Sequence, residues 1–166
     1  FGSLTRLCRL NDPLFRVWKE ILNRVPHSRL CLDQKPFVSE SMRELFFQRL
    51  QRQGIPRERV ELSCSNPHWV AYHDIDITLD CWPHNAGTTT IESLWMGVPV
   101  LSKTDRPSMG CVGASILKPL NLNDWVVADE TTYIDRAVGY ARDLNALAQL
   151  RATLRERIEA SPLLAA

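Results

Sequence analysis

The sequence predicts an α/β fold, in which helices cover both faces of a doubly wound, mostly parallel sheet of at least five strands. The first observation is that strand-like and helix-like segments alternate along the whole chain of 166 residues. The second is that the helical segments are about ten to fifteen residues long, which suits the crossover connections of parallel strands. The third is an ordinary globular composition, with 45% hydrophobic and 23% charged residues. A chain of this length is expected to build one domain around one core.

The predicted strands are short apolar runs bounded by turn residues. The run at 75–79 is the clearest of them, and we expect it to lie near the centre of the sheet. The predicted strands are residues 29–32, 59–63, 75–79, 98–102 and 125–128.

The first predicted helix, residues 11–25, carries apolar residues every three or four positions. Asn11 or Asp12 is suited to cap it, and Pro13 fits the first turn. Further helices are predicted over residues 67–73, 87–96 and 108–117, and a single or broken helix over 130–159.

The second predicted helix, residues 39–53, is amphipathic. Gly54 follows its last residue, as a helix-terminating glycine does. The face predicted to be buried consists of Met42, Leu45, Phe46 and Leu50.

Charge and hydropathy exclude several classes of partner. The formal net charge is +1, so nothing predicts electrostatic binding to nucleic acid or to an anionic membrane. The longest apolar runs have the length of strands, and none is long enough to span a bilayer. The chain opens at Phe1 without a methionine or a signal peptide, so we expect it to be part of a longer protein.

The five cysteines are far apart in the sequence and form no Cys-x-x-Cys pair or Cys/His cluster, so we expect no zinc site. An odd number of cysteines without a secretory signal is typical of reduced thiols in a cytoplasmic protein, with no structural disulfide. Asp74 and Asp76 imitate an Asp-x-Asp metal motif. They run into a strand instead of following one, and we interpret them as its beginning.

Ligands of parallel sheets bind beyond the carboxyl ends of the strands, where the strand order reverses, so the loops after strands are the places to search. The richest such loop covers residues 80–92. Gly87 permits close backbone approach, and Thr88, Thr89 and Thr90 bring hydroxyls and free N–H groups to the start of a helix. The helix dipole and these donors favour binding of a phosphate. The alternative interpretation is that the threonines only cap the helix.

Four more residues are candidates because of their positions. Glu92 lies about one turn deeper on the same helix face, where a carboxylate can accept hydrogen bonds from ribose hydroxyls. His68 begins the short helix before the strand at 75–79, where an imidazole can stack on a base or hold a phosphate. Arg6 and Arg9 lie near a bound pyrophosphate if the first residues of the chain end a strand. The alternative is that this histidine is structural and both arginines are solvated.

Residues 85–90 read Asn-Ala-Gly-Thr-Thr-Thr, and residues 94–100 read Leu-Trp-Met-Gly-Val-Pro-Val. The two segments together resemble the C-terminal catalytic lobe of the protein O-linked N-acetylglucosamine transferase family, which includes bacterial members and plant Spindly-type relatives. The resemblance covers nearly the whole chain, because further matches occur in the same order at residues 1–4, 18–32, 72–80, 112–115 and 161–163.

The resemblance implies a GT-B architecture, which pairs two Rossmann-like lobes around a nucleotide-sugar donor. Residues 1–166 would form the second lobe, while the N-terminal catalytic lobe and tetratricopeptide repeats would belong to the same polypeptide. The implied reaction transfers N-acetylglucosamine from UDP to Ser or Thr of an acceptor protein or peptide, without a metal or other cofactor. The implied partners include neither nucleic acid nor a membrane.

The resemblance also implies roles for single residues. Residues 87–89 match the pyrophosphate-binding turn of the family. His68 matches a histidine that packs against the uracil of the donor, and Glu92 matches an acidic residue that binds the ribose. Arg9 matches a lysine that contacts the donor phosphates and is important for turnover.

Four positions depart from the family pattern. Arg9 replaces the lysine with a cation of different reach and donor geometry, and Arg6 stands where the family usually has an amide. Ser65 occupies the place of a lysine in the animal enzymes, and Cys111 the place of an arginine in many members. Two alternatives therefore stay open, a GDP-fucose-dependent protein O-fucosyltransferase and a degenerate, non-catalytic module that binds nucleotide or scaffolds a partner.

Overall fold

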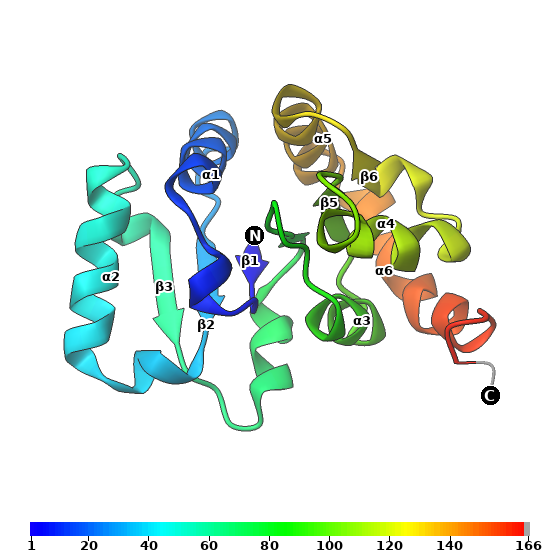
Figure 1. Ribbon diagram of the computed structural model, residues 1–166, viewed down its shortest axis with the longest axis horizontal. Helices are drawn as coiled ribbons and strands as arrows, with labels where there is room; N and C mark the ends of the chain where they lie inside the picture. Colours follow the sequence, from blue (N-terminus) through cyan, green and yellow to red (C-terminus); the bar gives the residue numbers. More distant parts are fainter. Residues whose placement is uncertain (165–166) are drawn as a thin grey trace.

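The computed structural model describes residues 1–164 and contains a six-stranded sheet (Figure 1). The strand order is β3-β2-β1-β4-β5-β6, the order found in Rossmann folds, and all neighbouring strands are parallel. The predicted α/β class and parallel sheet are therefore confirmed, with β4 near the centre. The strands are β1 (Gly2–Ser3), β2 (Leu30–Asp33), β3 (Val60–Ser63), β4 (Thr78–Leu79), β5 (Val100–Lys103) and β6 (Val126–Val127).

Helices connect the strands and follow the last of them (Figure 1). The α-helices of the described part of the chain are α1 (Asp12–Arg24), α2 (Glu40–Arg52), α3 (Thr88–Trp95), α4 (Val112–Leu117), α5 (Glu130–Arg142) and α6 (Leu144–Glu159). The short 3-10 helices are η1 (Leu7–Arg9), η2 (Lys35–Val38), η3 (Arg57–Arg59), η4 (His68–Asp74), η5 (Met109–Cys111), η6 (Lys118–Leu120) and η7 (Asn123–Trp125).

The helices form a layer on each side of the sheet. Helix α1 packs against α5, and it also meets α2, where the rings of Phe15 and Phe46 lie 5.9 Å apart. Helix α3 packs against α4 and α6 in the other layer. The sheet is thus covered on both faces, as a doubly wound fold requires.

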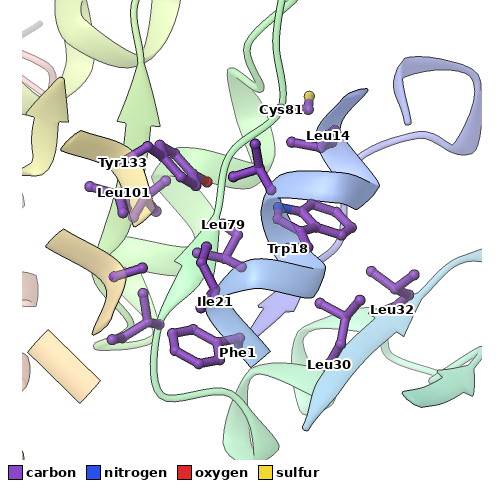
Figure 2. Packing of buried hydrophobic residues seen from close by; sticks show 14 of the residues in the cluster. Phe1, Leu14, Trp18, Ile21, Leu30, Leu32, Leu79, Cys81, Leu101 and Tyr133 are labelled. Atoms are coloured by element: carbon purple, nitrogen blue, oxygen red, sulfur yellow. The ribbon is translucent and has the colours of Figure 1, made fainter. Parts of the chain in front are cut away.

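Helix α1 shows how local sequence and core packing act together. The side chain of Asn11 accepts a hydrogen bond from the Leu14 N–H at 3.0 Å and caps the first turn. Leu14, Trp18 and Ile21 follow at helical spacing and belong to the same buried cluster as Leu79 of β4 (Figure 2). Burial of each such side chain stabilises the fold by about 1.5–3 kcal/mol.

The predicted strand at 75–79 is shorter in the structure, where only β4 joins the ladder. The backbone N–H of Ile75 donates to the carbonyl of Tyr72 at 3.3 Å and closes the last turn of η4. This hydrogen bond keeps the first residues of the predicted strand out of the sheet, although Ile75 is fully buried.

Two predicted helices also have different limits. The predicted helix at 108–117 consists of η5 followed by α4. The long helix at 130–159 is broken between α5 and α6 at Asp143, whose carboxylate accepts a hydrogen bond from the Ala146 N–H at 3.0 Å. An Asp at this place starts a new helix because it satisfies a free N–H of the first turn.

Helix α2 buries less of its predicted face than expected. Phe46 and Leu50 are buried, but Met42 is 36% and Leu45 is 60% exposed, so the prediction for these two residues is wrong. The helix covers the edge of the sheet beside β3 and buries only a narrow stripe. Gly54 follows it with a φ of +82°, the left-handed conformation that glycine adopts readily.

The structure also describes the cysteines and the candidate metal motif. All five cysteines are free. Asp76 pairs with Arg151 at 3.0 Å, and no group of three or more His, Cys, Asp or Glu side chains within residues 1–164 is arranged to hold a metal ion. Across the same residues, every helix is too short or too polar to cross a membrane.

The strand order fixes where a ligand can bind. From β1 the chain proceeds outward through β2 to β3, and from β4 it proceeds in the opposite direction to β6. The connections after β1 and β4 therefore diverge and leave a crevice at the carboxyl edge of the sheet, which is the usual ligand site of such folds.

Candidate functional site

A cavity of about 1090 Å³ lies at this crevice. It is lined by the segments that follow β1, β2, β3 and β4 and by Val112, which begins α4 after β5. Most of the candidate residues lie together in it. Those that line the cavity are Arg6, Arg9, His68, Gly87, Thr88, Thr89 and Glu92.

The start of α3 forms one wall of the cavity. Gly87 is the N-cap residue, and no side chain within residues 1–164 caps this end of the helix. The Thr90 N–H donates to the Gly87 carbonyl at 3.0 Å, whereas the N–H groups of Thr88 and Thr89 precede the first hydrogen bond of the helix and have no partner within it. The hydroxyls of Thr88 and Thr89 are therefore not used as caps, and they line the cavity together with free backbone donors. This arrangement suits an anion.

Thr90 is placed differently from the two threonines before it. Its side chain is fully buried, and its hydroxyl donates to the carbonyl of Ala86 at 3.0 Å. It does not line the cavity. We therefore assign Thr90 to the support of the turn and leave it out of the candidate site.

Asp80 holds the loop between β4 and α3 in shape, a role that the sequence analysis did not assign. One carboxylate oxygen accepts from the N–H groups of Cys81 at 2.9 Å and Ala86 at 2.8 Å. The other accepts from the Ser102 hydroxyl at 2.6 Å. Burial raises the pKa of Asp80 to about 6, against the effect of these hydrogen bonds. A Cβ at Gly113 would collide with Ser102 and this carboxylate, so α4 packs closely here.

Asp80→Asn is expected to remove a pH dependence of stability between about pH 4 and pH 6. The pKa is raised because the folded protein holds the proton of Asp80 more tightly than the unfolded chain does. The stability that comes from this protonated carboxyl is fully present below pH 3.8 and is lost as the pH rises through about 6. A rise of this size corresponds to roughly 3 kcal/mol. The variant amide keeps an oxygen for the two N–H groups and offers its NH₂ to Ser102. Urea unfolding of both proteins from pH 4 to pH 7 measures the difference, and a constant difference would contradict the expectation.

The two arginines after β1 have different environments. Arg9 is partly buried, and its guanidinium donates to the carbonyl of Asn85 at 3.2 Å, which ties the loop after β1 to the loop after β4. Arg6 is exposed at the cavity. Asn85 is itself buried and donates to the carbonyls of Cys81 and Lys103. Arg9 is thus held beside the loop that leads into α3.

His68 and Glu92 meet across the cavity wall. His68 Nε2 lies 3.2 Å from Glu92 Oε2, and both side chains are partly open to solvent. The phenol of Tyr72 donates to the carbonyl of Thr89 at 3.0 Å and fixes η4 against α3. Two residues that the sequence places 24 positions apart are thus neighbours.

Asp33 lines the cavity and was not predicted from the sequence. It is 5% exposed and ends β2, one residue beyond the predicted strand. It accepts hydrogen bonds from Ser63 and from Ser65, the residue that stands in the place of a lysine in the animal enzymes. Its position at the end of a strand is the signal that identifies it, because ligands of parallel sheets bind beyond the carboxyl ends of the strands.

Comparison with known proteins gives the family. A sequence profile of glycosyl transferase family 41 matches residues 1–166. The chain belongs to glycosyl transferase family 41. This result confirms the resemblance to the protein O-linked N-acetylglucosamine transferases.

Relatives within family 41 include plant proteins of the Spindly type. The chain is 38% identical to a probable UDP-N-acetylglucosamine–peptide N-acetylglucosaminyltransferase SPINDLY of Solanum lycopersicum, over 98% of this chain and 18% of the relative. It is 36% identical, with the same coverage, to the protein of that name in Arabidopsis thaliana. The chain thus spans less than a fifth of the length of these relatives.

Solved structures agree with the family 41 assignment. A mutant of the Thermobaculum terrenum O-GlcNAc transferase superposes with a TM-score of 0.90 and 33% identity, over 96% of this chain and 31% of that chain. Staphylococcus aureus TarM superposes with a TM-score of 0.70 at 14% identity over 95% of this chain and 31% of that chain, which supports the fold alone. The sheet and its helices therefore have the architecture of a GT-B C-terminal lobe.

Proposed function

We propose that this chain is the donor-binding lobe of a glycosyltransferase that transfers N-acetylglucosamine from UDP to Ser or Thr hydroxyls of proteins. The observation that carries the proposal is that candidates for the base, the ribose and the diphosphate, from three separate loops, line one cavity at the topological switch point. The names of the family 41 relatives support UDP-N-acetylglucosamine over GDP-fucose as the donor.

The nucleoside is proposed to bind between η4 and α3. His68 would pack against the uracil, and Glu92 would accept hydrogen bonds from the ribose hydroxyls. The 3.2 Å separation of their side chains supports this pairing, because the base and the ribose are adjacent parts of one nucleoside. The hydrogen bond from Tyr72 to Thr89 keeps the two elements at a fixed distance.

The diphosphate is proposed to bind at the start of α3. Free N–H groups at Gly87 and the hydroxyls of Thr88 and Thr89 would donate to its oxygens, and Arg9 would supply a positive charge. The leaving diphosphate gains negative charge as the bond to the sugar breaks. These groups would stabilise that charge in the transition state, which is the usual role of positioned donors in transferases.

The rest of the longer protein is proposed to complete the enzyme. Since the plant relatives are more than five times as long as this chain, an N-terminal catalytic lobe and tetratricopeptide repeats would supply the acceptor side. We further propose a cytoplasmic location, supported by free, widely spaced cysteines.

The intact protein is expected to bind UDP equally well in the presence and absence of EDTA. The cavity supplies cations and N–H donors to a diphosphate, and its lining includes the side chains of Arg6 and Arg9. Calorimetric titration with UDP, with and without EDTA, measures the effect. An affinity that depends strictly on magnesium or manganese would contradict metal-independent binding.

Turnover separates an enzyme from a degenerate binding module. The intact protein is expected to hydrolyse UDP-N-acetylglucosamine slowly and to transfer the sugar to a Ser- or Thr-containing acceptor. UDP binding without hydrolysis or transfer would favour the non-catalytic module. Turnover of GDP-fucose in place of UDP-N-acetylglucosamine would favour the fucosyltransferase.

A further inference from the structure

A buried carboxylate faces the cavity from the end of β2. Asp33 is 5% exposed and is among the residues that line the cavity, but the family resemblance assigns it no role. None of the ion pairs within residues 1–164 includes it. A carboxylate in this situation needs hydrogen-bond donors, because burial of an ionised group without them is costly.

The two oxygens of this carboxylate differ. Oδ2 accepts three hydrogen bonds, from Ser63 Oγ at 2.8 Å, from the Ser65 N–H at 2.8 Å and from Ser65 Oγ at 2.6 Å. Oδ1 accepts no hydrogen bond from any residue of the described chain, 1–164. One oxygen thus fixes the turn after β3, and the other is left for a ligand in the cavity.

Asp33 lies in the part of the cavity where the base of the nucleotide is proposed to bind. Strand β2 is separated from β4 by β1 alone, so the ends of β2 and β4 are about 10 Å apart. The diphosphate turn follows β4, whereas Ser65, which Asp33 holds, lies three residues before His68. A nucleoside that extends from the turn toward His68 brings the edge of its base toward Asp33.

We propose that Asp33 selects the base of the donor, by accepting at Oδ1 a hydrogen bond from an N–H on the Watson–Crick edge. This inference rests on the proposed function, in which the base is uracil. The N–H group that donates the hydrogen bond to Asp33 is then N3–H of the uracil. Cytosine carries a lone pair at N3, which the carboxylate repels. A site built to accept from a ligand N–H discriminates strongly against analogues that lack it, because its buried acceptor is then unpaired.

Asp33→Asn tests the inference because it replaces the hydrogen-bond acceptor Oδ1 by an NH₂ group, which is a hydrogen-bond donor. The Ser65 N–H can only donate, so the variant amide must place its oxygen where Oδ2 lies. Its NH₂ group then faces the cavity in the place of Oδ1. The turn keeps its three hydrogen bonds, while the atom that meets the base changes from an acceptor to a donor.

The experiment measures the affinities of the intact protein for UDP, CDP and the N3-methyl derivative of UDP by calorimetry. The wild type is expected to bind UDP about 10- to 100-fold more tightly than either analogue. Asp33→Asn is expected to weaken UDP binding by a similar factor, to strengthen CDP binding and to remove most of the penalty for the methyl group. Asp135→Asn, which neutralises an exposed carboxylate on α5, should leave all three affinities unchanged.

Several results would overturn the inference. Equal binding of UDP and its N3-methyl derivative by the wild type would do so without any variant, even if Asp33→Asn does not fold. An unchanged methyl penalty in Asp33→Asn would show that the penalty is steric. A wild type that binds no UDP would instead defeat the proposed function, and the inference with it.

Discussion

Replacement of Arg9 by alanine is expected to slow sugar transfer by the intact protein by about 100- to 1000-fold, the usual effect of removing one donor that stabilises transition-state charge. Arg9 lies at the cavity and is fixed there by its hydrogen bond to the Asn85 carbonyl at 3.2 Å. Its remaining N–H groups are available to the leaving diphosphate. Loss of the bond to Asn85 lowers stability by only about 1 kcal/mol, so the fold should persist.

Steady-state kinetics with UDP-N-acetylglucosamine measure this effect, and kcat should fall more than KM changes. Arg9→Lys restores the charge but not the planar fork, so its rate should lie between those of the wild type and Arg9→Ala. Arg16→Ala is the matched control, since Arg16 is exposed on α1 and does not line the cavity. If Arg9→Ala keeps the wild-type kcat, the role passes to Arg6.

The fold and most of the cavity were predictable because they depend on short-range signals. Alternating segments specify a parallel sheet, and a parallel sheet places all post-strand loops at one edge. The loop after β4 was therefore found from its sequence position, whereas the role of the residue that begins η4 was inferred from the family resemblance. The exact strand limits were not predictable, because a local hydrogen bond between Ile75 and Tyr72 keeps the first residues of the predicted strand 75–79 out of the ladder, so that β4 begins only at Thr78.

The two aspartates that organise the cavity were harder to identify. Asp80 acts through Ser102, and Asp33 acts through Ser65, which are 22 and 32 positions away in the sequence. Each pairing depends on which strands are neighbours and on their register. Such long-range contacts leave no periodic pattern in the sequence, although both aspartates follow strands.

Thr90 shows the limit of assigning a run of like residues to one role. Successive helical residues point about 100° apart, so three consecutive threonines cannot all face one cavity. Thr88 and Thr89 line it, whereas Thr90 turns toward Ala86 and the core. Glu92 returns to the cavity side, as its spacing predicts.

Substitutions of Thr88 and Thr89 are expected to change UDP affinity without changing the stability of the fold. Thr88→Val and Thr89→Val remove a hydroxyl and nearly preserve shape. Each is expected to weaken UDP binding by about 10- to 100-fold, the effect of losing a hydrogen bond to a charged phosphate. The unfolding midpoint without ligand should hardly change, because Gly87 is the N-cap residue and no side-chain cap is lost.

Thr90→Val is the matched control, and it should show the opposite pattern. Its hydroxyl is buried and bonded to Ala86, so its removal should lower stability by about 1 kcal/mol. UDP affinity should change less than in either of the other variants, because Thr90 does not line the cavity. Thermal melting without ligand and UDP titration of the three variants provide both readouts. If Thr88→Val and Thr89→Val melt earlier but bind UDP normally, the threonines serve the helix alone, and the diphosphate must bind nearer Arg6 and Arg9.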